Sequence, residues 1–175
     1  ISQRSFIPVG FNISINGTFI AAGAGTLFFN ENRFRIYIKY GYRTEPSNFY
    51  GIGYKQIKEA EKLKDLFGKD SVTFHKTNLQ FYPRFVWEIR PNLYAGTLLD
   101  INYSYSKDMP YWMMHNPGVA KYGNKYHNIG IGGLFQYDTR DDVATPFHGT
   151  FLSAMGTIYG KYLGGDFNYE MIELE

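Results

Sequence analysis

The most constraining feature of the sequence is a two-residue alternation of apolar and polar side chains over residues 78–90. Even positions are polar apart from Val86, whereas the odd positions form a continuous apolar stripe of about eleven residues. A period of two places these sets on opposite faces of a β-strand and does not fit a helix. The length matches a tilted strand that crosses a membrane core. The stripe consists of Leu79, Phe81, Pro83, Phe85, Trp87 and Ile89.

The same alternation recurs in other segments. It predicts strands over 34–42, 93–105, 128–137 and 152–159, and a strand that begins within 167–175. Residues 11–29 form either one long strand or two joined at Asn16-Gly17, a dipeptide typical of type I′ turns. We expect residues 72–90 to be a single strand of about 19 residues, unbroken at Pro83. The total is seven or eight strands with little helix.

The connections between these strands are of two unequal kinds. Short turns at 30–32, 91–92 and 138–148 alternate with long connections at 44–71 and 107–125, and 161–165 falls on the long side. If each strand crosses a membrane once, all long connections lie on one side, as in outer-membrane barrels. The pattern therefore predicts an all-β fold, an antiparallel transmembrane β-barrel, located in the bacterial cell outer membrane and in contact with its lipids.

The alternation also predicts which side chains face lipid and which face the lumen. Charged residues share a face with Gly, Asn, Ser and Tyr, and the apolar stripes end in aromatic residues. A soluble β-sandwich or lipocalin-like barrel, the alternative, would carry charges on its outward face. The predicted lipid-facing residues are Leu79, Phe81, Phe85, Trp87, Ile89, Leu99 and Ile101. The predicted lumen-facing residues are Arg33, Arg35, Lys39, Arg84, Glu88, Arg90 and Asp100, with Glu88 and Asp100 as counter-charges.

The composition agrees with two chemically different faces. Aromatic residues make up 19% of the chain, yet the mean hydropathy is only −0.33, since an average over both faces hides the apolar one. The absence of cysteine excludes disulfides and thiolate metal sites. A net charge of +2 without a clustered basic face argues against nucleic acid as a partner. Residues 19–29, the longest nearly apolar stretch, are too short for a transmembrane helix.

No pattern in the sequence indicates catalysis. The acidic cluster at 138–142 lacks a partner base, and the four histidines show no metal-ligand spacing. We therefore expect no enzymatic activity, no metal and no cofactor. Residues 55–67 are the one helical passage, with opposite charges four residues apart, and we interpret them as a solvated helix in a long external connection.

Three segments carry a resemblance to a known family. A glycine-rich strand leads into Tyr137-Asp138-Thr-Arg140-Asp141, then Pro146-Phe-His-Gly149, and later Gly164-Gly165-Asp166. This order resembles the barrel of the bacterial surface antigen family, the BamA/TamA-like outer-membrane assembly factors. Residues 49–53 resemble a segment of relatives from Bacteroidetes-like bacteria. The resemblance implies that Tyr137, Asp138, Arg140, Asp141, Pro146 and Gly149 form a structural periplasmic turn.

The resemblance also implies an architecture and a role. The family barrel has sixteen strands and is preceded by POTRA repeats, which residues 1–175 do not contain. The chain would supply roughly the middle half of such a barrel, or alternatively close as eight strands. The implied function is outer-membrane protein assembly, insertion or translocation, with unfolded outer-membrane proteins and other machinery subunits as partners. The alternatives are the anchor or secretion pore of a fused enzyme such as a patatin-like lipase, and a passive porin or surface-binding barrel.

Overall fold

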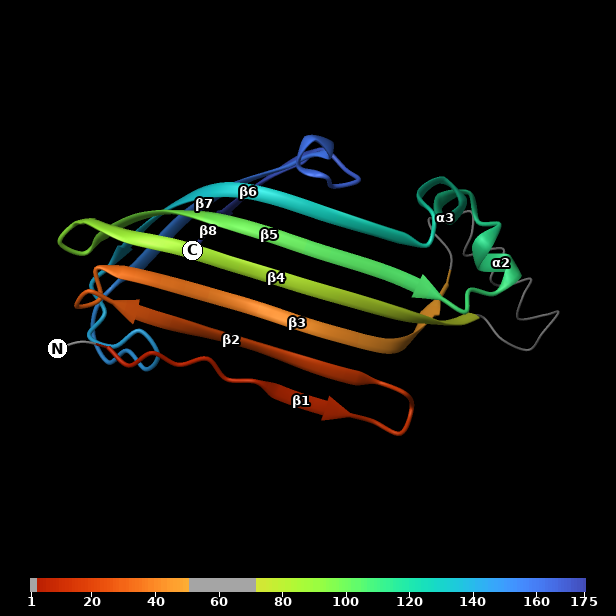
Figure 1. Cartoon of the computed structure of the whole chain (residues 1–175), viewed down its shortest axis with the longest axis horizontal. Helices are drawn as coiled ribbons and strands as arrows, with labels where there is room; N and C mark the ends of the chain where they lie inside the picture. The colour runs from red at the N-terminus through yellow and green to blue at the C-terminus, as the bar shows by residue number, and fades with distance from the viewer. Residues whose placement is uncertain (1–2, 51–71) are drawn as a thin grey trace.

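The computed structural model describes residues 3–50 and 72–175, and its strands form one antiparallel sheet in chain order (Figure 1). The strands are β1 (Gly10–Ile13), β2 (Phe19–Phe29), β3 (Phe34–Phe49), β4 (Val72–Arg90), β5 (Leu93–Lys107), β6 (Lys125–Asp138), β7 (Phe151–Tyr159) and β8 (Tyr169–Leu174). The helical turns are α2 (Tyr111–Met114), α3 (Pro117–Tyr122) and η1 (Lys161–Leu163). None of these described helices is long and apolar enough to cross a membrane. The helix predicted at 55–67 lies outside the described residues.

The sheet confirms the all-β prediction but is open. β1 and β8 are its two edges, and no ladder joins them in the part of the chain that the structure describes. The alternative of eight strands closing on themselves is therefore wrong for these residues. The sheet is nevertheless curved, because side chains on one face meet across intervening strands. Arg84 of β4 lies 3.6 Å from the sulfur of Met155 on β7, for example.

β4 is the single 19-residue strand that the sequence predicted. Pro83 lies in its interior, opposite Ile38 of β3. The paired residues of β4 and β5 are interrupted at Tyr82 and Pro83 and resume in the same register at Arg84. This is where a missing proline N–H would weaken a ladder. The proline is thus accommodated within an inner strand rather than ending it.

One boundary differs from the prediction. β3 continues to Phe49, whereas residues 44–49 were expected in a connection. These residues pair with 72–77 of β4 despite the polar sequence Thr44-Glu45-Pro46-Ser47, so cross-strand pairing outweighs their weak strand propensity. Of the two alternatives for residues 11–29, the structure has two strands, and the turn between them contains Asn16-Gly17 with Gly17 at φ +89°.

Short and long connections lie at opposite ends of the strands. One end, which we call the short-turn rim, carries residues 30–33, 91–92 and 139–150. The other, the long-connection rim, carries the segment with α2 and α3 and the segment with η1, as well as the 14–18 turn. In Figure 1 the short-turn rim is on the left, and α2 and α3 extend from the right. The 30–33, 91–92 and 139–150 connections share one rim, as expected from the sequence, whereas the 14–18 turn is a short connection on the other rim.

The only sizeable buried apolar cluster among the described residues lies on the inner, concave face. It consists of Val86, Tyr94, Leu98, Leu134 and Met155, with Tyr37 and Tyr82 packed against it. Large apolar side chains are instead numerous on the opposite, convex face, where Trp87 is 47% exposed and Phe135 is 61% exposed. The usual relation between an apolar inside and a polar outside is therefore reversed over much of this sheet.

Candidate functional site: an apolar convex face and a charged concave face

A row of aromatic side chains crosses the convex face near the short-turn rim. The strand registers align Phe29, Phe34, Trp87, Ala95 and Phe135 on five successive strands. The ring centroids of Phe29 and Phe34 are 5.6 Å apart, and those of Phe34 and Trp87 are 4.8 Å apart in a stacked arrangement. These contacts make the row a continuous aromatic surface over β2, β3 and β4.

A second aromatic row crosses the same face near the long-connection rim. Here the registers align Tyr42, Leu79, Tyr103 and His127. The Tyr103 and His127 rings stack at 6.4 Å, and Tyr42 lies 6.1 Å from the ring of Phe19. The aromatic residues of this row include Tyr42 and Tyr103, whereas the row at the short-turn rim has phenylalanine and tryptophan. The tyrosine hydroxyl groups make this border of the convex face more polar.

The surface between the two rows is apolar. The registers place six of the seven residues predicted to face lipid on the convex face, and Ile89 lies at a register shift between Glu88 and Arg90. Leu79, Phe81, Trp87 and Ile89 are 44–54% exposed. Phe85, Leu99 and Ile101 are partly exposed. Across the described strands, the one charged residue at convex positions between the rows is Glu170, the second residue of edge strand β8. Extended apolar surfaces of this kind mark contact with another apolar phase or protein.

The concave face carries a buried ion-pair network at the short-turn rim. Nη1 of Arg35 donates to Oδ2 of Asp138 at 2.7 Å, and Nε of Arg140 donates to Oδ1 of the same carboxylate at 2.9 Å. The side chains of Arg35 and Asp138 are 6% and 1% exposed. The guanidinium of Arg35 also donates to the Tyr94 hydroxyl and lies over that ring. A buried carboxylate is stable only with such charged, hydrogen-bonding partners.

Asp138 begins the turn that the family resemblance singled out. Asp141 caps this turn, because its Oδ1 accepts from the backbone N–H groups of Phe147 and His148 at 3.1 and 3.2 Å. The hydrogen bond from His148, followed by those from Phe147 and Asp142, holds the pKa of the exposed Asp141 carboxyl below its ordinary value. Gly149 has φ +113°, and a Cβ there would collide with the carbonyl oxygen of Thr139.

The remaining motif residues frame this turn. Tyr137 is 44% exposed on the convex face, while Arg140 links Asp138 to the turn through its side chain and its backbone N–H. Pro146 lies in the exposed part of the turn. The structure therefore brings Asp138, Arg140, Asp141 and Gly149 together in one compact unit.

The residues predicted to face the lumen divide into two groups. Arg35, Lys39, Arg84 and Asp100 lie on the concave face, although Lys39 remains exposed. Arg33 and Arg90 are exposed at the short-turn rim, where Arg33 lies 3.9 Å from Glu88. Of the two expected counter-charges, Glu88 is within ion-pair distance of Arg33, whereas Asp100 has no basic partner within 4.0 Å among the described residues. Arg35 pairs with Asp138, whereas Asp100 accepts a hydrogen bond of 2.6 Å from the Tyr159 hydroxyl.

The sequence did not predict that several polar groups of the concave face are buried. Gln136 and Ser153 are paired in the β6–β7 register and are 2% and 5% exposed. Gln136 Oε1 and Ser153 Oγ have no hydrogen-bond partner among the described residues, and the same is true of Tyr82 Oη, Asp100 Oδ1 and Asn128 Oδ1. All five lie on the concave side of β4 to β7. The alternation could have placed them there, but only the curvature makes them buried.

The described residues do not assemble a metal site, since no group of three or more His, Asp or Glu side chains is gathered among them. The fold and its two faces define the class of the protein as a curved, open, antiparallel β-sheet with an apolar outer surface and a polar, ion-paired inner surface. Comparisons with protein-family models, with curated proteins and with solved structures gave no match to the chain.

Proposed function

We propose that the chain forms part of the wall of a bacterial outer-membrane β-barrel, with its convex face against lipid and its concave face toward the lumen. The observation that carries this proposal is the apolar band between two aromatic rows on the convex face. Outer-membrane barrels have such a band flanked by aromatic girdles, with polar residues inside. The charged concave face and the opposite placement of short and long connections support the same assignment.

The spacing of the rows supports a membrane of ordinary thickness. Phe34 and Tyr42 mark the two rows on β3 and are eight residue steps apart. At about 3.3 Å per residue this is about 26 Å along the strand. A strand tilt of about 40° reduces the height to about 20 Å between the row centres, and the rings themselves extend the band towards the roughly 25 Å of known barrels.

A soluble sheet is disfavoured by the same surface. In water, the convex face would expose large side chains such as Phe81, Phe135 and Leu152 with no charged neighbour on the inner strands. Soluble β-proteins protect themselves from association with outward charges. Here the charges are on the concave side and at the rims, so the arrangement suits lipid better than water.

We further propose a role in outer-membrane protein assembly, insertion or translocation, without catalysis, metal or cofactor. This finer proposal is supported by the likeness of residues 130–169 to the outer-membrane assembly family. The motif residues form one hydrogen-bonded turn at the short-turn rim, which is the periplasmic rim of the proposed barrel. The partners would be outer-membrane lipids, unfolded outer-membrane proteins and other subunits of the machinery.

Trp87 provides the test of the membrane assignment. It belongs to the aromatic row near the short-turn rim and is 47% exposed. A Trp112→Phe variant keeps Trp87 as its sole tryptophan and can be folded into vesicles of lipids brominated at different acyl depths. We expect the strongest quenching from bromines near the headgroups, because aromatic girdles lie at the interface. Quenching by aqueous iodide but not by any brominated lipid would contradict the proposal.

A separate experiment tests the assembly role. Vesicles that contain the chain should accelerate the folding of a denatured outer-membrane protein relative to protein-free vesicles of the same lipid. A passive porin would instead give ion conductance without acceleration.

The control for the tryptophan-quenching measurement is the Trp87→Phe variant. Its one remaining tryptophan, Trp112, belongs to α2 at the opposite rim.

A further inference from the structure

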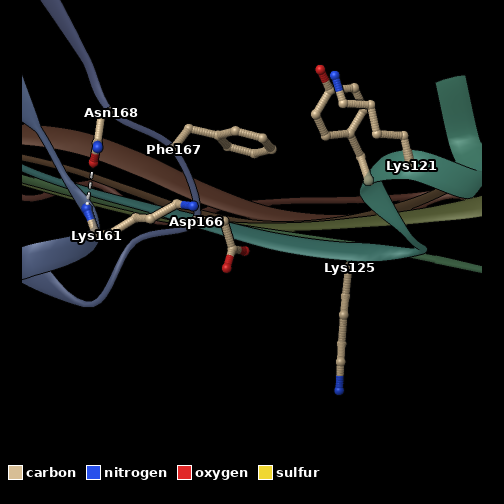
Figure 2. A pocket seen from close by; sticks show the side chains of 7 residues that line it. Lys121, Lys125, Lys161, Asp166, Phe167 and Asn168 are labelled. Carbon is tan, nitrogen blue, oxygen red and sulfur yellow. Dashed lines mark hydrogen bonds between the residues drawn. The ribbon is translucent and has the colours of Figure 1, made fainter.

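An open cleft of about 520 Å³ lies at the long-connection rim, between the end of α3, the start of β6 and the connection from β7 to β8. Three lysines, two aromatic rings and two polar side chains line it (Figure 2). They are Lys121, Tyr122, Lys125, Lys161, Asp166, Phe167 and Asn168. The cleft is on the opposite rim from the Arg35–Asp138 network, so neither that network nor the turn motif accounts for it.

Phe167 is held in a defined position in this cleft. Its ring meets the rings of Tyr122 and Tyr126 edge-on, at centroid distances of 5.6 and 6.0 Å. On one side of it in the chain, Asp166 is fixed by two hydrogen bonds of 2.8 Å with the backbone of His127. On the other side, Oδ1 of Asn168 accepts from the backbone N–H of Lys161 at 2.8 Å. The connection is therefore anchored around an apolar wall.

The three lysines of the cleft are electrostatically unbalanced. None of them has an acidic partner within 4.0 Å in residues 3–50 and 72–175. Asp166, the carboxylate of the cleft, lies 3.5 Å from Nδ1 of His127. The ammonium group of Lys121 lies 5.1 Å from the Tyr122 ring centroid. A ligand with negative charge would supply the counter-charge that the described residues lack.

The spread of the lysines indicates the size of that ligand. Lys121 lies beside the Tyr122 ring. In Figure 2, Lys125 extends to the opposite side of the strand from Phe167, and Lys161 points towards Asp166. The three ammonium groups do not converge on one point, so a small anion would meet only one of them. A headgroup with several separated phosphates would meet more than one of them.

The position of the cleft indicates the source of such a headgroup. Lys125 is the first residue of β6 and pairs with Tyr105. This pair lies two register steps beyond the Tyr103–His127 pair of the aromatic row, on the side of the long-connection rim. Lysines just beyond an aromatic girdle are at the depth of lipid headgroups, where they attract anionic lipids. We propose that this cleft binds a lipid headgroup that carries two or more phosphates. The proposal rests on the membrane assignment above, which sets this depth.

Binding can be measured with the purified chain in neutral detergent micelles. The probes are diphosphoryl lipid A, its monophosphoryl form and inorganic phosphate. The test variant combines Lys121→Gln, Lys125→Gln and Lys161→Gln, and the matched control removes the same charge outside the cleft through Lys39→Gln, Lys76→Gln and Lys107→Gln. Far-UV circular dichroism checks that both variants keep the strand content of the parent, and the three single Lys→Gln variants replace the triple if it does not.

We expect the diphosphoryl lipid to bind more tightly than the monophosphoryl form, and inorganic phosphate not to compete at equal concentration. The cleft variant should lose on the order of 100-fold in affinity, and each single variant about fivefold, as expected for lysines at an anionic surface. The control should change by less than about threefold. Equal losses in both triple variants, equal affinity for both lipids, or full competition by phosphate would overturn the proposal. Trp87 quenching is a separate readout, so failure of the membrane assignment is distinguishable from failure of this site.

Discussion

Arg35 and Asp138 are 103 residues apart in the chain, yet Nη1 of the arginine lies 2.7 Å from Oδ2 of the aspartate. They belong to β3 and β6, which are separated in the sheet by β4 and β5. In a flat sheet with a strand spacing of about 4.8 Å, β3 and β6 would be about 14 Å apart. The pair can meet because the sheet curves, because the arginine side chain is long, and because Asp138 is the last residue of β6. The ion pair thus links β3 to β6 across two strands and stabilises the curvature of the sheet at the short-turn rim.

Breaking this pair should be costly. Asp138→Asn leaves the guanidinium groups of Arg35 and Arg140 without their shared carboxylate in a buried setting. We expect the free energy of unfolding to fall by about 3–5 kcal/mol, as for other buried pairs that lose one partner. Urea unfolding of the protein in detergent or vesicles measures this change.

The control for that experiment is the pair Arg43–Glu45, which has a similar N–O distance of 2.6 Å but an arginine that is 54% exposed. Glu45→Gln should cost less than about 1 kcal/mol, because solvent screens an exposed pair. Equal costs for the two variants would show that the buried network does not hold the sheet.

Charge placed on the convex face should be expensive if that face meets lipid. Phe85→Arg puts a guanidinium between the two aromatic rows, and we expect a loss of roughly 2–4 kcal/mol in folding into vesicles. Arg84→Ala, the neighbouring change on the concave face, should be mild, because Arg84 contacts Met155 and the rings of Tyr37 and Tyr82 without an ion pair. If vesicles tolerate both variants equally, the facing assignment is wrong.

The two glycines at 149 and 156 should respond differently to a methyl group. Gly149→Ala combines a left-handed φ with a collision against Thr139, so we expect a loss of about 1–3 kcal/mol. At Gly156 an added Cβ would point into open space, with no heavy atom within 4 Å, and Gly156→Ala should be neutral or slightly stabilising. Thermal or urea unfolding distinguishes the two. A neutral Gly149→Ala would mean that the turn can adopt another backbone conformation.

The turn should loosen in acid through Asp141. Its pKa is lowered in the folded protein, so its contribution is complete above the ordinary aspartate value of about 4 and is lost as the pH falls through the lower, folded value. We expect the hydrogen-exchange protection factors of the Phe147 and His148 amides to fall in that acid range, since both donate to Asp141. Asp141→Asn should remove this pH dependence, and its persistence in that variant would assign it to another group.

The strands were predictable because one face of each is apolar. The alternation from Leu79 to Ile89 identified β4 despite Pro83, and the hairpin with β5 followed from Pro91-Asn92. The end of β3 was not predictable, because Thr44 to Phe49 has weak strand propensity and is stabilised by pairing with β4. Local sequence does not contain that long-range term.

The charged network was only half predictable. The family resemblance placed Asp138 and Arg140 in one turn, and in the structure their side chains form an ion pair. The alternation placed Arg35 on the polar face, but its partner depends on how far the sheet curves, which no local pattern encodes. Glu88 and Asp100 lay on the same face and were equally plausible partners from sequence, although Asp100 is engaged by Tyr159 instead.

The small size of the concave cluster has a thermodynamic consequence. Five side chains form it, while the larger apolar area of the described strands points the other way. The medium that covers the convex face therefore contributes to the free energy of folding in the way that a buried core does in a soluble protein. The free energy of unfolding of the chain consequently depends on its surroundings. Detergents of different chain length should give different values, so the surrounding medium is best treated as a component of the native state.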